Sequence, residues 1–232
     1  MRYELKMTFP KEKRDWVLEC LSESEFGIRE IFMQRKVNNI YLDTLNYSDF
    51  LGNFHGDAAR PKFRIRWYGD SFTNVKNPVL EMKYKQGLLG GKKTMAFPPF
   101  RSDETFCWSE VRRMLQKQMR AIPAEEVYLL NEVLARDPVL FSAYERRYFE
   151  TFSGKCRVTL DWDLVYYNPE IAFAGRDDLF ASKDNIVVVE VKCEEDASKD
   201  AQKLVNALGF RLTKNSKYVA GVVSTQSGLY DT

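Results

Sequence analysis

Polar and apolar residues alternate along several short segments of the chain, as they do in strands whose two faces meet different surroundings. This alternation, with runs of β-branched and aromatic residues, predicts strands over residues 2–9, 37–43, 62–68, 79–85, 92–97, 142–152, 155–167, 186–193 and 217–224. Apolar residues at helical spacing predict helices over 16–21, 104–120, 124–136 and 198–208. The pattern indicates an α+β fold built on an antiparallel sheet.

The polar face of five of these strands carries mostly charged residues. Residues 62–68 place Arg64 and Arg66 on one face, residues 79–85 place Glu81 and Lys83 on one face, and residues 2–8, 155–163 and 186–193 are similar. A sheet with one wet face is the ordinary explanation, but Ser, Thr, Asn or Gln would serve it equally well, and like charges on neighbouring strands repel. We therefore expect an antiparallel barrel whose polar face points inward around a polyanion and whose apolar face lies under the helices.

The mixture of charges suggests which polyanion this is. Guanidinium groups match phosphate oxygens with two hydrogen bonds and ammonium groups act as compact charges, so together they suit a chain of phosphates. Carboxylates among them would repel phosphate unless they hold a divalent cation, so Glu4, Glu81 and Glu190 suggest Mg²⁺ or Mn²⁺. Cross-strand ion pairs at a surface are the simpler alternative for Glu81 with Lys83 and for Glu190 with Lys192.

Composition narrows the class of protein. The 232 residues are 44% hydrophobic, which is enough for a sizeable core, and no linker divides them, so we expect a single domain over residues 1–232. A net charge of +2 does not indicate nucleic acid as a partner. The four cysteines lie far apart and are expected to be reduced thiols in a cytoplasmic protein. No apolar run could cross a bilayer, and His55 is expected to lie in a loop.

Short motifs spread over most of the chain support a family resemblance. In order they are Glu4-x-Lys6, Tyr41-x-Asp43-Thr44, Arg64-x-Arg66, Glu81-x-Lys83, Tyr144-x-Arg146, Arg157-Val158-Thr159-Leu160-Asp161, Glu190-x-Lys192 and Ser216-Lys217-Tyr218. The set resembles the triphosphate tunnel metalloenzyme superfamily, and more closely the catalytic domain of the vacuolar transporter chaperone (VTC) family of polyphosphate polymerases. The resemblance implies a tunnel of antiparallel strands lined by basic and acidic residues.

The resemblance also implies roles for individual residues. The implied phosphate ligands are Lys6, Arg64, Arg66, Lys83, Arg146, Lys214 and Lys217, with Arg157 facing the same tunnel and with either Lys92 or Lys93, of which Lys93 is preferred. Arg64, Arg66, Lys83 and Arg146 would stabilise the transferring phosphoryl group. Glu190 resembles the metal-binding glutamate of the family, and Glu4 and Glu81 are either further ligands of Mn²⁺ or Mg²⁺ or partners that orient the basic side chains.

The implied reaction transfers the γ-phosphoryl group of ATP, or of another nucleoside triphosphate, to a polyphosphate chain and releases ADP. Other branches of the superfamily begin with ExExK, whereas Arg2 occupies the first of these positions here, which favours the polymerase branch over the hydrolytic one. The alternatives are a metal-dependent triphosphatase and a polyphosphate-binding module without turnover. The protein is expected to act alone, as bacterial members of the family do, or with a separately encoded membrane protein that holds it at the membrane.

Overall fold

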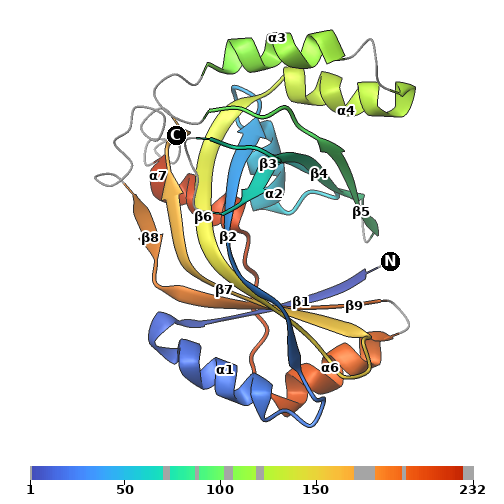
Figure 1. Cartoon of the computed structure of the whole chain (residues 1–232), viewed down its shortest axis with the longest axis vertical. Coiled ribbons are helices and arrows are strands. Elements are labelled where there is room, and N and C mark those ends of the chain that lie inside the picture. Colours follow the sequence, from blue (N-terminus) through green and yellow to red (C-terminus); the bar gives the residue numbers. More distant parts are fainter. Residues whose placement is uncertain are drawn as a thin grey trace. The chain divides into compact units, whose positions relative to one another are not determined.

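A computed structural model describes residues 2–69, 74–86, 89–101, 107–118, 123–169, 181–194 and 197–226 (Figure 1). Its strands are β1 (Arg2–Pro10), β2 (Arg29–Asp43), β3 (Ala59–Tyr68), β4 (Val79–Gln86), β5 (Leu89–Ala96), β6 (Asp137–Glu150), β7 (Cys156–Tyr167), β8 (Ser182–Asp184) and β9 (Ile186–Glu194). Its helices are α1 (Arg14–Ser22), α2 (Ser48–His55), α3 (Trp108–Gln118), α4 (Ala124–Leu134), α6 (Ser198–Ala207) and α7 (Lys217–Thr225), with a short 3₁₀ helix, η1 (Lys11–Lys13). Within the described ranges, no helix is both long enough and apolar enough to span a bilayer.

The strands form one sheet in the order β1-β9-β7-β6-β2-β3-β4-β5, with β8 paired to β7. The α+β architecture on an antiparallel sheet is confirmed, but the path of strands is open, with β1 and β5 at its ends, where a closed barrel was expected. The irregular segment before α7 touches the outer edge of β1, where the backbone N–H of Thr213 donates a hydrogen bond to the carbonyl of Lys6 at 2.8 Å. This edge carbonyl is thereby paired without another strand.

The chain divides into two compact units of three segments each. Unit 1 comprises Met1–Lys36, Tyr144–Leu164 and Lys183–Ser216, and unit 2 comprises Val37–Ala143, Val165–Ser182 and Lys217–Thr232. Each unit has its own hydrophobic core. The expectation of a single domain over residues 1–232 stays a prediction.

The core of unit 1 is formed by the apolar face of its strands and two helices. Alternate residues of β1, β7 and β9 point into it, and α1 and α6 lie on the same side of β1 and β9 in Figure 1. The buried contributors from the strands are Leu5, Met7, Val158, Leu160, Val187, Val189 and Val191, and those from the helices are Val17, Leu21, Ala201, Leu204 and Val205. The charged residues occupy the other alternate positions of these strands and therefore point to the opposite face of the sheet.

Unit 2 repeats this arrangement with different elements. Its core contains alternate residues of β2, β3, β4 and β5 together with the buried faces of α3 and α4. The strand residues are Ile40, Leu42, Phe63, Ile65, Trp67, Leu80, Met82 and Met95, and the helical ones are Val111, Leu115, Leu129, Leu130 and Val133. The expectation that helices cover the apolar face of the sheet is therefore met in each unit.

The segment after residue 216 is a helix, α7, and the predicted strand over 217–224 is wrong. Tyr218, Gly221 and Val222 are its buried residues, and their spacing of three and four is that of one helix face. A Cβ on Gly221 would lie 2.5 Å from Leu140 Cδ2, so only glycine lets the helix approach the strand this closely. The valines suit a strand or a buried helix equally well, and packing decides between them.

Helix α2 was not predicted, and His55 is its last residue and not a loop residue. The carboxylate of Asp43 accepts hydrogen bonds from the backbone N–H groups of Asp49 (2.9 Å) and Phe50 (2.8 Å) in the first turn. It also accepts a hydrogen bond from the hydroxyl of Tyr218, whose pKa is raised by burial and by Asp43. The motifs around Asp43 and Tyr218 thus join the end of β2 to α2 and α7.

Cys156 and Cys193 are paired in a disulfide, which corrects the expectation of four reduced thiols. The two residues lie directly opposite each other on β7 and β9, with Cα atoms 4.4 Å apart, although 37 positions separate them in the sequence. Spacing along the chain could not show this, because the pairing depends on the strand register. Cys20 and Cys107 are free thiols.

Removing this disulfide is expected to destabilise the protein. The double variant Cys156→Ala/Cys193→Ala should lose about 3 kcal/mol of unfolding free energy in urea melts, because the cross-link restricts a long loop of the unfolded chain. Cys20→Ala is the matched control and should change stability much less. Alkylation of the denatured, unreduced protein should label only Cys20 and Cys107, and labelling of all four cysteines would contradict the pairing.

Candidate functional site

The polar face of unit 2 holds a carboxylate surrounded by basic side chains. Glu81 on β4 lies directly opposite Arg64 on β3, and the Arg64 Nε donates to Glu81 Oε2 at 2.6 Å. Arg66 Nη1 is 3.7 Å from the same oxygen, while its Nε donates to Asn39 Oδ1 on β2 at 2.9 Å. Arg64, Arg66 and Glu81, which the sequence predicts to share a face, are therefore brought together.

Lys92, and not Lys93, belongs to this cluster. Lys92 lies opposite Lys83, and its Nζ is 2.5 Å from Glu81 Oε1. Lys93 lies opposite Met82, on the apolar face, with its Nζ 5.7 Å from the ring centre of Tyr128. The preference for Lys93 is therefore corrected, because residues directly opposite each other in an antiparallel pair share a face.

Burial and charge together fix the ionisation of Glu81, which is only 4% exposed. Burial alone would raise its pKa, but Arg64, Arg66 and Lys92 outweigh this and hold the pKa well below its ordinary value. Glu81 is thus an anion at neutral pH and holds three cations in place. This geometry favours the orienting role over metal ligation, since its two carboxylate oxygens already face Arg64 and Lys92.

In unit 1 the corresponding anchor is Asp161 on β7, which is completely buried. It accepts two hydrogen bonds from Arg146 on β6, from Nε at 2.5 Å and from Nη2 at 2.7 Å. This bidentate pair fixes the plane of the guanidinium. Arg146 Nη2 also lies 4.0 Å from Glu190 Oε2.

Glu190 on β9 lies at the centre of the polar face of unit 1. Lys6 on β1 and Thr159 on β7 lie directly opposite it on either side, and Lys192 Nζ is 2.7 Å from Glu190 Oε1. Burial alone would raise the pKa of Glu190. The positive charges of Lys192, Lys6 and Arg146, together with a hydrogen bond to Glu4, outweigh burial and hold this pKa well below its ordinary value. Glu4 is also paired with Lys6 at 2.9 Å.

Three further predicted phosphate ligands lie outside the clusters around Glu81 and Glu190. Arg157, opposite Lys192, has an exposed side chain 3.8 Å from Glu150. Lys214 is exposed in the segment along β1. Lys217 is the first residue of α7 in unit 2, not a strand residue.

Glu4 and Glu190 are the two predicted metal ligands in unit 1. They lie on the adjacent strands β1 and β9, and each is paired with a lysine in this structure. Mg²⁺ or Mn²⁺ takes carboxylate oxygens together with phosphate oxygens and water. In the part of the chain that the structure describes, no three acidic, histidine or cysteine side chains converge to hold a metal alone. A cation here would therefore depend on oxygen atoms of the substrate.

Sequence reasoning missed the partners that hold the cations. Asn39 orients Arg66 and Asp161 orients Arg146, whereas the ion pair of Glu190 with Lys192 was one of the alternatives drawn from the sequence. Parity places Asp161 on the polar face, so a signal for it was available. Asn39 is different, because it lies in a nearly continuous buried run of β2 that shows no alternation.

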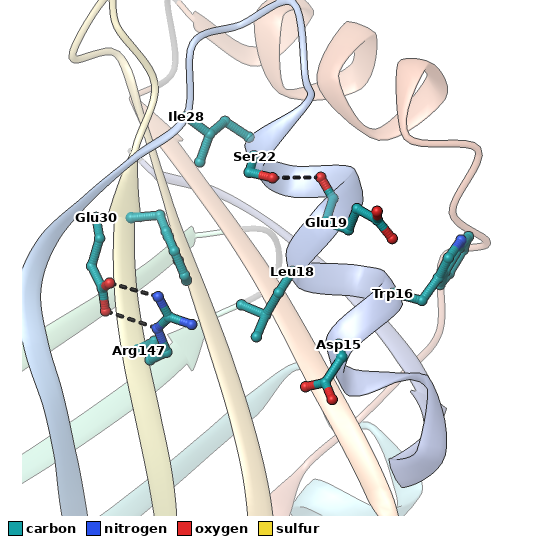
Figure 2. Close-up of a pocket in the computed structure, with 9 residues that line it drawn as sticks. Asp15, Trp16, Leu18, Glu19, Ser22, Ile28, Glu30 and Arg147 are labelled. Carbon is teal, nitrogen blue, oxygen red and sulfur yellow. Dashed lines mark hydrogen bonds and ion pairs between the residues drawn. The ribbon is translucent and has the colours of Figure 1, made fainter.

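A cavity of about 670 Å³ lies elsewhere in unit 1, between α1, β2 and β6. Figure 2 shows Glu30 and Arg147 facing each other there, with hydrogen bonds of 2.8 and 2.6 Å. Asp15 and Glu19 add two more carboxylates. Its net negative lining makes it unsuitable for a polyanion.

Comparisons with known proteins identify a family and a similar fold. The family model of the VTC domain matches residues 5–226. No curated protein matches the sequence. A crystal structure of a candidate adenylate cyclase from Vibrio parahaemolyticus is similar with a TM-score of 0.53 and 13% identity, covering 94% of this chain and 97% of that one. The structure of another candidate adenylate cyclase, from Bacillus halodurans, has a TM-score of 0.49 and 13% identity, and the match covers 93% of this chain and 94% of that one.

Proposed function

The chain belongs to the VTC domain family, and from this and from its fold we propose that it is an ATP-dependent polyphosphate polymerase. The observation that carries the proposal is that each unit presents basic side chains oriented by a buried carboxylate, Glu81 in unit 2 and Asp161 in unit 1. Cations held in this way are preorganised for phosphate oxygens and need little rearrangement when phosphate binds.

The proposed chemistry is an in-line phosphoryl transfer. A terminal oxygen of the polyphosphate chain bonds to the γ-phosphorus of ATP while the bond to the bridging oxygen breaks, and ADP leaves with the electron pair. The attacking oxygen is already anionic at neutral pH, so no general base is required. We propose that Arg64, Arg66 and Lys83 of unit 2 neutralise charge on the transferring group and that Arg146 of unit 1 binds phosphate oxygens.

A divalent cation would be held by Glu190 and Glu4, with phosphate oxygens as its other ligands. When bound, Mn²⁺ or Mg²⁺ would neutralise negative charge on the phosphates. Lys6 and Lys192 hold the two carboxylates in position through ion pairs of 2.9 and 2.7 Å.

The test is incubation of the purified protein with ATP and Mn²⁺, followed by a gel stained for polyphosphate and an assay for free phosphate. Long chains support the polymerase. Free phosphate without chains overturns it in favour of a triphosphatase, and unchanged ATP with retained binding of polyphosphate overturns it in favour of a binding module. We further propose a separately encoded membrane protein as a partner.

Lys92 and Lys93 offer a matched pair of variants for phosphate binding. Lys92→Ala is expected to raise the Kd for tripolyphosphate about fivefold, the equivalent of about 1 kcal/mol for a partly exposed charge. Lys93→Ala should leave the Kd close to that of the wild type, because its side chain lies on the opposite face of β5. Isothermal titration calorimetry measures both. Equal effects of the two substitutions would contradict the assignment of Lys92.

A further inference from the structure

A second, smaller cavity in unit 1 has the opposite charge from the one near α1. Its volume is about 370 Å³, and it lies between the turn that joins β6 to β7, the end of β9 and Ala197. Lys155, Arg157 and Lys192 contribute three positive charges to its lining, and Glu194 contributes one negative charge. A cavity with this excess of cations attracts anions.

This cavity continues the polar face that carries Glu190. In the register of β1, β9 and β7, one row contains Lys6, Glu190 and Thr159, and the row two residues further along contains Glu4, Lys192 and Arg157. Two residues of a strand span about 6.6 Å. Lys192 and Arg157 therefore belong both to the charged face and to the lining of the cavity, so phosphate bound beside Glu190 lies next to its entrance.

The turn beyond Arg157 brings a further cation, Lys155, to this cavity. The backbone N–H of Gly154 donates to the carbonyl of Thr151 at 2.8 Å, and Gly154 has φ of +71°, a conformation that favours glycine. The disulfide partner Cys156 lies between Lys155 and Arg157 in the sequence, and Cys193 follows Lys192. The cross-link thereby ties together the two strands that carry the cations.

The acidic neighbours of two of these cations, Lys155 and Arg157, hold them only weakly. Lys155 Nζ is 3.7 Å from Asp200 Oδ2, and Arg157 Nε is 3.8 Å from Glu150 Oε1; the side chains of Lys155 and Arg157 are exposed, whereas that of Glu150 is only 20% exposed. Ion pairs of this length in water contribute under about 1 kcal/mol, so a phosphate chain can compete for both side chains.

We propose that this basic cavity binds the phosphates of a polyphosphate chain that extend beyond a bound triphosphate. The inference rests on the proposed function and adds a subsite that favours long chains over short ones. Lys155 is the residue that should distinguish chain lengths, because it lies beyond the row of Lys192 and Arg157.

The test compares the Kd of tripolyphosphate with that of long-chain polyphosphate by titration calorimetry. In Lys155→Ala, the Kd of the long chain is expected to rise about fivefold more than the Kd of tripolyphosphate, which corresponds to about 1 kcal/mol. Lys203→Ala, which removes an exposed lysine from α6 outside the cavity, is the matched control and should leave the ratio of the two values unchanged. The ratio in the wild type alone is not diagnostic, since a longer chain offers more ways to bind.

The outcomes separate this inference from the proposed function. An equal rise in both Kd values for Lys155→Ala, or a ratio no different from that of the control, overturns the subsite while wild-type binding still supports the polymerase. Failure of the wild type to bind either ligand overturns both. A change of the ratio in Lys155→Ala alone supports the subsite.

Discussion

Asp161→Asn is expected to lower the free energy of unfolding by about 3–5 kcal/mol, because it leaves the buried guanidinium of Arg146 without its compensating charge. Asp161 is fully buried and binds Arg146 through two hydrogen bonds. Urea denaturation measures the change. The matched control is Asp15→Asn, which disrupts an exposed pair with Arg14 and should cost under about 1 kcal/mol.

A second variant separates the effect of this ion pair on stability from its effect on turnover. Arg146→Met/Asp161→Leu removes both charges and fills the space with apolar atoms, so we expect it to recover most of the stability that Asp161→Asn loses. It should nevertheless lose turnover, because the oriented guanidinium is gone. Full activity in the double variant would contradict the role of Arg146, and a small loss in Asp161→Asn would contradict the role of Asp161 as its anchor.

Glu81→Gln is expected to lower the free energy of unfolding at neutral pH by about 3 kcal/mol. The substitution keeps the shape of the side chain but leaves Arg64, Arg66 and Lys92 close together without an anion. Tripolyphosphate should raise the Tm of this variant more than that of the wild type, because the ligand then supplies the missing negative charge. Glu110→Gln, an exposed position on α3, is the control.

The same variant should change the response to acid. The pKa of Glu81 lies well below its ordinary value in the folded protein, so its stabilisation is fully present above the ordinary pKa, about 4.3, and is lost as the pH falls below it. Glu81→Gln should therefore show a shallower loss of stability between about pH 5 and pH 2 than the wild type. Urea melts at several pH values measure this, and identical slopes would show that Glu81 is not the anion inferred here.

The face of the sheet on which a strand residue lies could be predicted from sequence, because alternate residues of a strand point to opposite faces. Arg64 and Glu81 were placed on one face in this way, and the register confirms it. The same reasoning could have resolved the choice of lysine, since Met95 and Phe97 are core residues with the parity of Lys93, which leaves Lys92 on the polar face.

Pairs between distant strands could not be predicted, because they depend on register and turn geometry. The two hydrogen bonds between Arg146 and Asp161 exist only because the turn after β6 aligns β7 in one way. Cys156 and Cys193 meet for a similar reason, through the register of β7 with β9. Helix α7 was mistaken for a strand because its valines and Tyr218 show the strand pattern, and only the close contact at Gly221 distinguishes a helix.

The division of the chain into interleaved segments has a practical consequence for dissecting the protein. Each unit is assembled from three separate stretches, so the polypeptide passes from one unit to the other five times. A truncated expression clone that ends after residue 143, 164 or 182 would encode fragments of both units and the whole of neither. Proteolytic nicking within β2, β6 or β7 should likewise damage both at once, so point substitutions are the suitable tool for assigning roles to either unit.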